Sequence, residues 1–271
     1  MSFIITILAA LLVFSAVIAI HEFGHFTVAK LCGIQVNEFS IGMGPVLWKK
    51  NHKGTQYSLR ALPVGGFVAL EGEESPESQQ AEAAHTVQEQ PAPETEASVQ
   101  PTGVPLNEAP VWQRALVMVA GAVMNFVLGF ILLLVLVASG SAVTSKIIYD
   151  FQGENPKSQA SGLQVNDEIM SVNRHFCFTA EDVMYELQRT ENDTATITVL
   201  RDGKLVTLPQ VQFDSTTNAD GTTSMVLDFR VYGIEKTLRS VVHGAARYFC
   251  YYARVILRGF LDLFTGRVGV T

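Results

Sequence analysis

Three side chains near the N-terminus have the types and the spacing of a metal site. His21, Glu22 and His25 form the pattern His-Glu-x-x-His. Successive side chains on an α-helix are about 100° apart, so the two histidines point within roughly 40° of each other. Two imidazoles one turn apart can both coordinate one Zn²⁺. Zinc lowers the pKa of a water molecule, and Glu22 is placed to take the proton of that water as it attacks a carbonyl.

The position of this motif favours a metal site over a chance match in an ordinary helix. Residues 3–20 are apolar apart from one Thr and one Ser, so the motif follows a segment long enough to cross a bilayer. Ionisable groups at membrane depth are costly and usually have a function. A cleaved signal peptide is the alternative for the first run, but no Lys or Arg precedes it. We therefore predict a retained span with His21 and His25 as zinc ligands and Glu22 as the catalytic base.

A second apolar segment, residues 115–138, contains Asn125 with Gly121 and Gly129 four residues to either side. Small residues at this spacing let two helices pack closely, and an Asn can join them by a hydrogen bond. A functional interpretation stays open beside this structural one: the face packs against the zinc helix and Asn125 reaches the substrate backbone. The two interpretations are compatible, so Asn125 is a candidate substrate-binding residue.

Composition indicates a membrane protein with one acidic linker. The chain has 271 residues, of which 48% are hydrophobic, and its formal net charge is −7. Residues 73–108 contain eight Glu and no Lys, Arg or Asp, so the rest of the chain is near +1. The sequence has no basic stripe, which argues against nucleic acid as a partner. The three cysteines are far apart, which predicts neither a disulfide framework nor a zinc knuckle.

The segment between the two spans divides into a β region and a linker. Two runs within residues 35–72 are rich in Val, Phe, Tyr and Leu and are separated by a polar turn, which predicts a β-hairpin region. Residues 73–109 are rich in Glu, Pro and Gln and cannot bury enough apolar surface to fold. We expect this insert to be disordered.

The segment after the second span has the pattern of a soluble, β-rich domain over residues 144–233. Asp202-Gly203 lies between two β-type runs and predicts a hairpin turn. Thr179 is a good N-cap for a helix over residues 180–188.

Residues 235–265 predict an amphipathic helix rather than a third span. Polar side chains recur every three or four residues and form one stripe: Arg239, His243, Arg247, Tyr251, Arg254 and Arg258. Apolar side chains fall mostly on the other side: Val242, Ala245, Phe249, Tyr252, Ile256, Phe260 and Leu263. Such a helix lies on a bilayer or on a protein surface.

Lys and Arg near the span ends predict the orientation in the membrane. The N-terminus has none, whereas the loop between the spans carries or borders on Lys30, Lys49, Lys50, Lys53, Arg60 and Arg114. The positive-inside rule places this loop in the cytoplasm and residues 144–271 outside. The histidines would then lie in the cytoplasmic part of the first span.

Taken together, these features resemble the bacterial intramembrane zinc metalloproteases of the site-2 protease family, in its RseP-like branch. The resemblance covers nearly the whole chain apart from the Glu-rich insert. It rests on His-Glu-x-x-His in the first span, on EFSIGMGP (38–45), on YSLRALPVGGFVALEGE (57–73) and on the Gly121/Asn125 pattern. Ala122 departs from the Pro that the family often has there.

This resemblance implies Zn²⁺ as the cofactor, and the lipid bilayer and transmembrane protein substrates as partners. It also implies that residues 35–70 form β structure dipping into the membrane beside the zinc. An exposed strand edge there can hold an unwound substrate by backbone pairing. Gly65 and Gly66 would allow close approach of the substrate backbone, so both are candidate substrate-binding residues. The expected location is the bacterial inner membrane, as a multi-pass protein.

Residues 144–233 resemble a PDZ domain through QASGLQVNDEIMSVN (159–173). Ser161 and Asn166 replace the usual Ala and Gly, and Asn tolerates the left-handed conformation that Gly would take. In the family, this domain excludes substrates with large outer domains until another protease has trimmed them. The amphipathic helix resembles the family's segment after the PDZ domain.

The chain departs from the family at the third zinc ligand. A catalytic zinc needs three protein ligands, and the family takes the third from a Leu-Asp-Gly motif on a later span. The sequence ends at GRVGVT before any such motif. We therefore expect a truncated fragment or partial gene product that binds zinc weakly and has no turnover.

Two functions remain in view. His-Glu-x-x-His favours an intramembrane protease that cleaves single-span proteins, such as an anti-sigma factor or a signal-peptide remnant. The missing ligand favours a non-catalytic, membrane-anchored PDZ adaptor.

The predicted fold is an α+β membrane protein: transmembrane helices with a membrane-associated β-hairpin region, plus a PDZ-like β-rich domain with an amphipathic helix after it. The expected segments are the first transmembrane helix (1–34), the β region (35–72), the insert (73–109), the second transmembrane helix (110–140), the PDZ-like domain (144–233), the amphipathic helix (235–265) and a truncated end (266–271).

Overall fold

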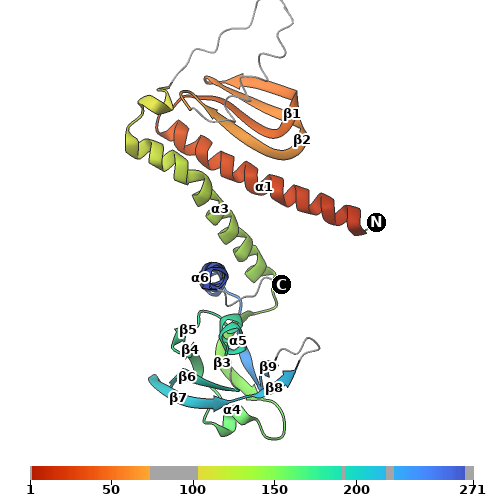
Figure 1. The fold of residues 1–271 in the computed structure, drawn as a ribbon, viewed down its shortest axis with the longest axis vertical. Coiled ribbons are helices and arrows are strands. Elements are labelled where there is room, and N and C mark those ends of the chain that lie inside the picture. The colour runs from red at the N-terminus through yellow and green to blue at the C-terminus, as the bar shows by residue number, and fades with distance from the viewer. Residues whose placement is uncertain (1, 74–102, 191–192, 218–222, 266–271) are drawn as a thin grey trace, which may run out of the picture. The chain divides into compact units, whose positions relative to one another are not determined.

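The structure is a computed structural model, and it describes residues 2–73, 103–190, 193–217 and 223–265 (Figure 1). It divides into two compact units, residues 1–129 and 130–271, which we describe one at a time. Helix α3 (Val111–Ser139) contributes its first part to one unit and its end to the other. The predictions made for residues 74–102 and 266–271 lie outside the described residues.

Two helices are long and apolar enough to cross a membrane: α1 (Ser2–Leu31) and α3. Helix α1 ends where Gly33 adopts a φ of 73°, and Ile34 N–H donates to the Ala29 carbonyl at 2.9 Å. This is the Schellman pattern that closes many helices. Most large apolar side chains of both helices are exposed, as expected of helices surrounded by hydrocarbon.

Strands β1 (Val36–His52) and β2 (Thr55–Leu70) form an antiparallel two-stranded sheet beside α1 (Figure 1). Residues 38–41 of β1 pair with the end of β2 and also with its beginning, so the sheet curls around them. Among them, Glu38 is buried and accepts hydrogen bonds from Ser58 at 2.5 Å and Arg60 at 2.9 Å. The interior of this sheet is therefore partly ionic.

The predicted insert ends earlier than expected, because residues 103–109 are part of the first unit. Val104 forms a parallel bridge to Ile34, and a short 3₁₀ helix, η1 (Leu106–Glu108), follows. Leu106 packs against the apolar cluster at the end of α1. The prediction of disorder over this part was wrong, since an average over a Glu-rich segment hides the few apolar residues at its end.

The second unit contains a sheet in the order β10-β3-β4-β6-β7, with β5 paired to β4. The strands are β3 (Val143–Phe151), β4 (Glu168–Val172), β5 (His175–Phe176), β6 (Thr194–Arg201), β7 (Lys204–Gln212) and β10 (Phe229–Ile234). Strands β8 (Asp214–Thr217) and β9 (Thr223–Val226) form a separate pair. Two short helices, α4 (Lys157–Ala160) and α5 (Ala180–Gln188), complete the domain.

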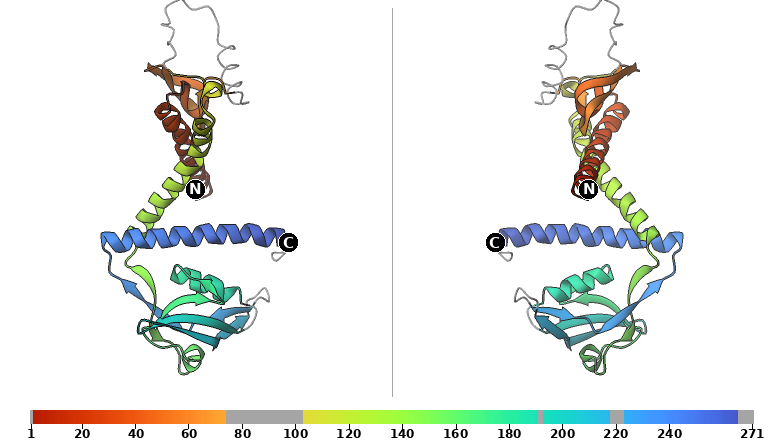
Figure 2. Two further views of the ribbon diagram at one scale, coloured as in Figure 1. Left: turned by 90° about the vertical axis from the view of Figure 1, so that its left-hand side faces the viewer. Right: turned by 90° about the vertical axis from the view of Figure 1, so that its right-hand side faces the viewer.

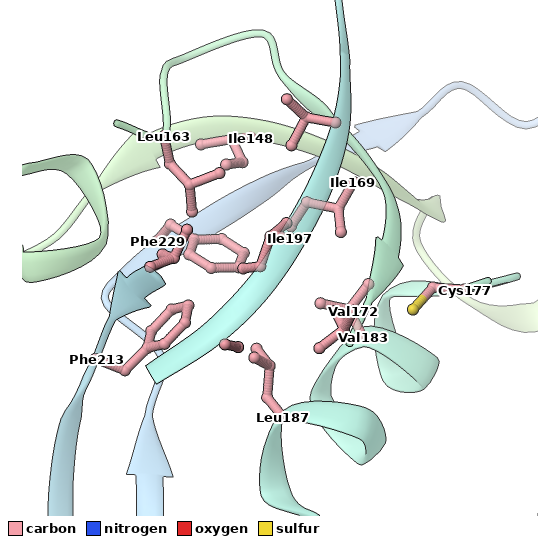
Figure 3. Close-up of a cluster of buried hydrophobic side chains, with 13 residues drawn as sticks. Ile148, Leu163, Ile169, Val172, Cys177, Val183, Leu187, Ile197, Phe213 and Phe229 are labelled. Atoms are coloured by element: carbon pink, nitrogen blue, oxygen red, sulfur yellow. The ribbon is translucent and has the colours of Figure 1, made fainter. Parts of the chain in front are cut away.

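One apolar core holds this domain together, built from both the sheet and α5 (Figure 3). Ile148, Ile169 and Ile197 come from three neighbouring strands and are fully buried. Leu187 from α5 packs into the same cluster. Such burial contributes about 1.5–3 kcal/mol for each large apolar side chain.

Three local predictions for this domain are confirmed. Helix α5 begins after Thr179, whose side chain accepts a hydrogen bond from Asp182 N–H. Asp202 and Gly203 both have positive φ and join β6 to β7, as a type I′ turn requires. Asn166 adopts a φ of 71°, in the left-handed region.

Helix α6 (Leu238–Thr265) presents the second half of its polar stripe to the domain. Arg254 forms an ion pair with Asp182, and Arg258 with Glu186, both carboxylates being on α5. Arg189 just after α5 pairs with Asp262 of α6 at 2.7 Å. The predicted contact with a protein surface is therefore made by charged groups.

Candidate metal centre

His21 and His25 point toward each other from consecutive turns of α1. Their Nε2 atoms are 3.1 Å apart, and their ring centroids are 4.8 Å apart. Two nitrogen donors bound to one tetrahedral Zn²⁺, each at about 2.0–2.1 Å, are about 3.3 Å apart. The separation of the two nitrogens therefore suits one shared ion.

The other nitrogen of each imidazole contacts α3 within the first unit. Nδ1 of His25 lies 2.7 Å from the carbonyl oxygen of Val117, to which it can only donate, so a neutral His25 keeps its lone pair on Nε2. Nδ1 of His21 lies 3.2 Å from the side-chain amide nitrogen of Asn125. The amide oxygen of Asn125 is buried without a hydrogen-bond partner, and a half-turn of the amide would bring it to Nδ1. Contacts of this kind fix the tautomer of metal-binding histidines.

Two glycines keep the space in which these groups meet. A Cβ atom at Gly121 would lie 2.4 Å from Nε2 of His25 and 2.6 Å from Nε2 of His21. A Cβ atom at Gly24 would lie 2.5 Å from the carbonyl oxygen of Ala120. Any larger residue at either position would push the helices apart or displace the imidazoles.

The β region lies along α1 close to the histidines. The hydroxyl of Ser15 contacts the carbonyl oxygen of Pro63, and six residues of helix separate Ser15 from His21, about 9 Å. Gly65 follows with a φ of 80°, and a Cβ atom at Gly66 would lie 2.7 Å from the carbonyl oxygen of Ser40. The structure of the sheet therefore explains why both positions are glycine, whether or not a substrate binds there.

The profile of Peptidase family M50 matches residues 9–270. The chain belongs to Peptidase family M50.

Curated relatives of this M50 chain agree with the family. A protein of Mesorhizobium japonicum that is named a zinc metalloprotease is 34% identical over 213 residues, which are 76% of this chain and 54% of that protein. One of Clostridium perfringens with the same kind of name is 35% identical over 74% of this chain and 52% of its own length. Metalloprotease MmpA of Caulobacter vibrioides is 29% identical over 76% and 52%. The M50 chain thus spans about half the length of the curated relatives it matches.

Zinc is the expected cofactor of an M50 chain, and the residues present fit it. The two Nε2 atoms converge, Val117 fixes the tautomer of His25, and Gly121 leaves room beside both nitrogens. Among the described residues, no group of three His, Cys, Asp or Glu side chains could hold a metal ion. Within the described residues, His21 and His25 are therefore the candidate ligands of the zinc ion.

Sequence reasoning missed two contributors to this centre. Val117 acts through its backbone carbonyl, which no residue type reveals, although it lies four residues before Gly121 in the small-residue pattern. Gly24 lies inside the motif itself, and the close approach of Ala120 explains why it has no side chain. The signal for Gly24 was available, since a helix-interior glycine usually has a packing reason.

Proposed function

We propose that the protein is an intramembrane zinc metalloprotease, with His21 and His25 as zinc ligands and Glu22 as the general base. The observation that carries this proposal is the pair of Nε2 atoms, 3.1 Å apart, at the end of an apolar span. When bound, zinc would lower the pKa of a water molecule and polarise the carbonyl of the scissile bond. Two apolar helices and the family indicate a membrane location.

The proton chemistry falls to Glu22. Glu22 follows His21 on α1 and is half-buried. As the general base, its carboxylate would take a proton from the attacking water and pass it to the leaving amine. Val117 and Asn125 would hold the two imidazoles in the orientation that leaves both Nε2 lone pairs facing the ion. In this role Asn125 supports His21, in addition to the substrate contact predicted for it.

The proposed substrates are single-span membrane proteins, for example an anti-sigma factor or a signal-peptide remnant. A substrate helix must unwind before its amide can react, and a strand edge can hold the extended segment. Residues 66–70 of β2 pair with β1 on one side and have no strand partner on the other among the described residues. Gly65 and Gly66, next to this edge and near Ser15 of α1, remain the proposed substrate-binding residues.

Residues 144–233 are proposed to form a PDZ-like domain that controls access of substrates. Support comes from the sheet with α4 and α5, from the buried Leu163, and from the left-handed Asn166 in the motif. By the positive-inside rule, this domain would lie outside the cytoplasm, with the histidines in the cytoplasmic part of α1.

The number of ligands favours a second candidate function. A catalytic zinc takes three protein ligands, and the described residues offer His21 and His25. We therefore propose that zinc held by these two ligands alone is bound weakly and gives no turnover. If the complete gene product supplies no third ligand, the protein is a membrane-anchored PDZ adaptor rather than a protease.

Cleavage of a single-span reporter by the complete gene product, reconstituted in vesicles, tests this proposal. Glu22→Gln should abolish cleavage while leaving zinc content unchanged, because Glu22 is not a ligand. Glu154→Gln is the matched control, since Glu154 is exposed in the other unit. Equal cleavage by wild type and Glu22→Gln would show that Glu22 is not the base. Absence of zinc from both proteins would favour the adaptor.

A further inference from the structure

The polar stripe of α6 divides into a paired and an unpaired half. In its second half, Arg254 and Arg258 meet the carboxylates of α5. In its first half, Arg239, His243 and Arg247 are exposed, and no ion pair or hydrogen bond joins their side chains to any described residue. These three residues follow at four-residue spacing, so they face the same side of the helix. A row of unpaired donors on one face is suited to an anion from outside the chain.

A cavity of about 330 Å³ lies beside the unpaired half. Its lining includes Arg239, His243 and Arg247, together with Thr144 and Ser240, and no Asp or Glu. Burial lowers the pKa of Lys146, Glu168 opposes this, and the nearby charge of Arg247 lowers that pKa further. The cavity thus combines room for a small group with two guanidinium groups in its lining.

The end of α3 sets the depth of this cavity relative to a bilayer. A helix of 29 residues rises about 43 Å. That length nearly matches the roughly 40–45 Å between the outer edges of the two headgroup layers. The last turn of α3 therefore reaches the headgroups when α3 crosses the membrane.

The first half of α6 is attached to that last turn. Val137 packs with Val143 and Ala245 in one buried cluster, and Lys236 donates to the Ala138 carbonyl at 3.1 Å. The views in Figure 2 agree that the start of α6 lies at the end of α3. The cavity beside the first half of α6 is therefore held at the level of lipid headgroups.

The outward side of α6 is apolar, although the helix is not itself a candidate span. Leu238 is 84% exposed and Phe264 is 88% exposed, and Val242, Leu257 and Phe260 between them are exposed as well. Apolar side chains on a helix at the membrane surface contact the acyl chains of lipids. The headgroup of a lipid at this place would contact guanidinium groups, and its acyl chains would contact apolar side chains of α6.

We propose that the cavity binds the phosphodiester headgroup of an anionic phospholipid, with Arg239, His243 and Arg247 around the phosphate. Its acyl chains lie along the exposed side of α6. Arg guanidinium groups hold phosphate oxygens by paired, charge-assisted hydrogen bonds. The inference needs α3 to cross a membrane but not proteolysis, so it and the proposed function can fail separately.

Native mass spectrometry of the full chain in a neutral detergent, titrated with phosphatidylglycerol or phosphatidylcholine, tests this site. Wild type should prefer phosphatidylglycerol by at least about tenfold, and Arg239→Gln/Arg247→Gln should lose that preference, since each charged hydrogen bond is worth about tenfold in affinity. Arg174→Gln/Lys204→Gln removes the same charge from exposed positions elsewhere in the second unit and should bind like wild type. Circular dichroism of all variants should be unchanged.

Four outcomes would overturn the proposal. Equal binding of the two lipids would mean that the site does not distinguish an anionic headgroup from a zwitterionic one. An equal loss in Arg174→Gln/Lys204→Gln would make the attraction non-specific. Displacement by inorganic phosphate at equal concentration would point to a soluble anion, and displacement by a peptide with a free C-terminal carboxylate would point to a protein ligand.

Discussion

Leu12 in the first unit and Ile197 in the second are similar side chains in opposite surroundings. Leu12 on α1 is 70% exposed, whereas Ile197 on β6 is fully buried among other aliphatic side chains (Figure 3). Charged side chains are buried in both units: Glu38 is 3% exposed in the first, where it bonds Ser58 and Arg60, and Asp182 is fully buried in the second. The units therefore differ in their large apolar side chains, which are mostly exposed on α1 and α3 and mostly buried in the core of the second unit. Exposed apolar side chains are expected of helices that are surrounded by hydrocarbon.

Helix α6 belongs to the second unit, but it exposes large apolar side chains as α1 and α3 do. Arg254 and Arg258 face the domain through Asp182 and Glu186. Exposed apolar side chains therefore occur in both units, and four measurements test how the two units differ in stability and access.

Arg254→Met should have the largest effect, because it leaves Asp182 buried without its cation. Asp182 is fully buried and Arg254 also contacts the Phe176 carbonyl. Breaking a buried ion pair from one side costs about 3–5 kcal/mol. Hydrogen exchange of α5 and β4 amides would report the loss as faster exchange. Lys204→Met, at an exposed position, should stay within about 0.5 kcal/mol of wild type, and a similar cost for both would mean that the pairing of α6 contributes nothing.

Ile197→Ala and Leu12→Ala make nearly the same truncation in the two units. Ile197→Ala should destabilise the second unit by about 2–5 kcal/mol through a cavity in its core. Leu12→Ala should cost far less, because lipid chains fill the space that the side chain leaves. Unfolding in detergent, followed by hydrogen exchange in each unit, measures both. Comparable losses of stability at the two positions would mean that Leu12 and Ile197 do not lie in opposite surroundings.

Gly121→Ala should weaken zinc binding by roughly tenfold to a hundredfold, since its Cβ would lie 2.4 Å from Nε2 of His25 and 2.6 Å from Nε2 of His21, the proposed ligands. Zinc retention after dialysis against a weak chelator measures this effect. Gly129→Ala is the matched control on the same helix, because its Cβ would meet no atom within 4 Å. If Gly121→Ala keeps its zinc, the ion is not held where His21 and His25 meet.

Cys177 should be the least reactive cysteine of the chain. Burial, and next the nearby charge of Glu186, raise the pKa of Cys177 to about 11, above its ordinary 9.0. At pH 8 it therefore has about a hundredfold less thiolate than an ordinary thiol. In a Cys32→Ser/Cys250→Ser variant, iodoacetamide labelling at pH 8 should be slow, and it should rise as the pH approaches 11. Rapid labelling at pH 8 would show that the core of the second unit opens readily.

Much of the local structure could be predicted from residue types at short range. The N-cap at Thr179, the turn at Asp202-Gly203 and the left-handed Asn166 each depend on a few neighbouring residues, and the structure has all three. The predicted C-terminal boundary of the insert was wrong, because Val104 forms a bridge to Ile34, about seventy residues away. Contacts at that separation leave no periodic signal in a sequence.

Residue types and helical geometry are enough to place His21, Glu22 and His25 at one end of an apolar helix, with the two histidines one turn apart. What surrounds them depends on tertiary contacts: the Val117 carbonyl, the Asn125 amide and the space kept by Gly24 and Gly121. Tertiary contacts also bring Arg254 and Arg258 of α6 to the carboxylates of α5. Both depend on where two helices cross, and that choice is made by many distant contacts at once, which no single segment encodes.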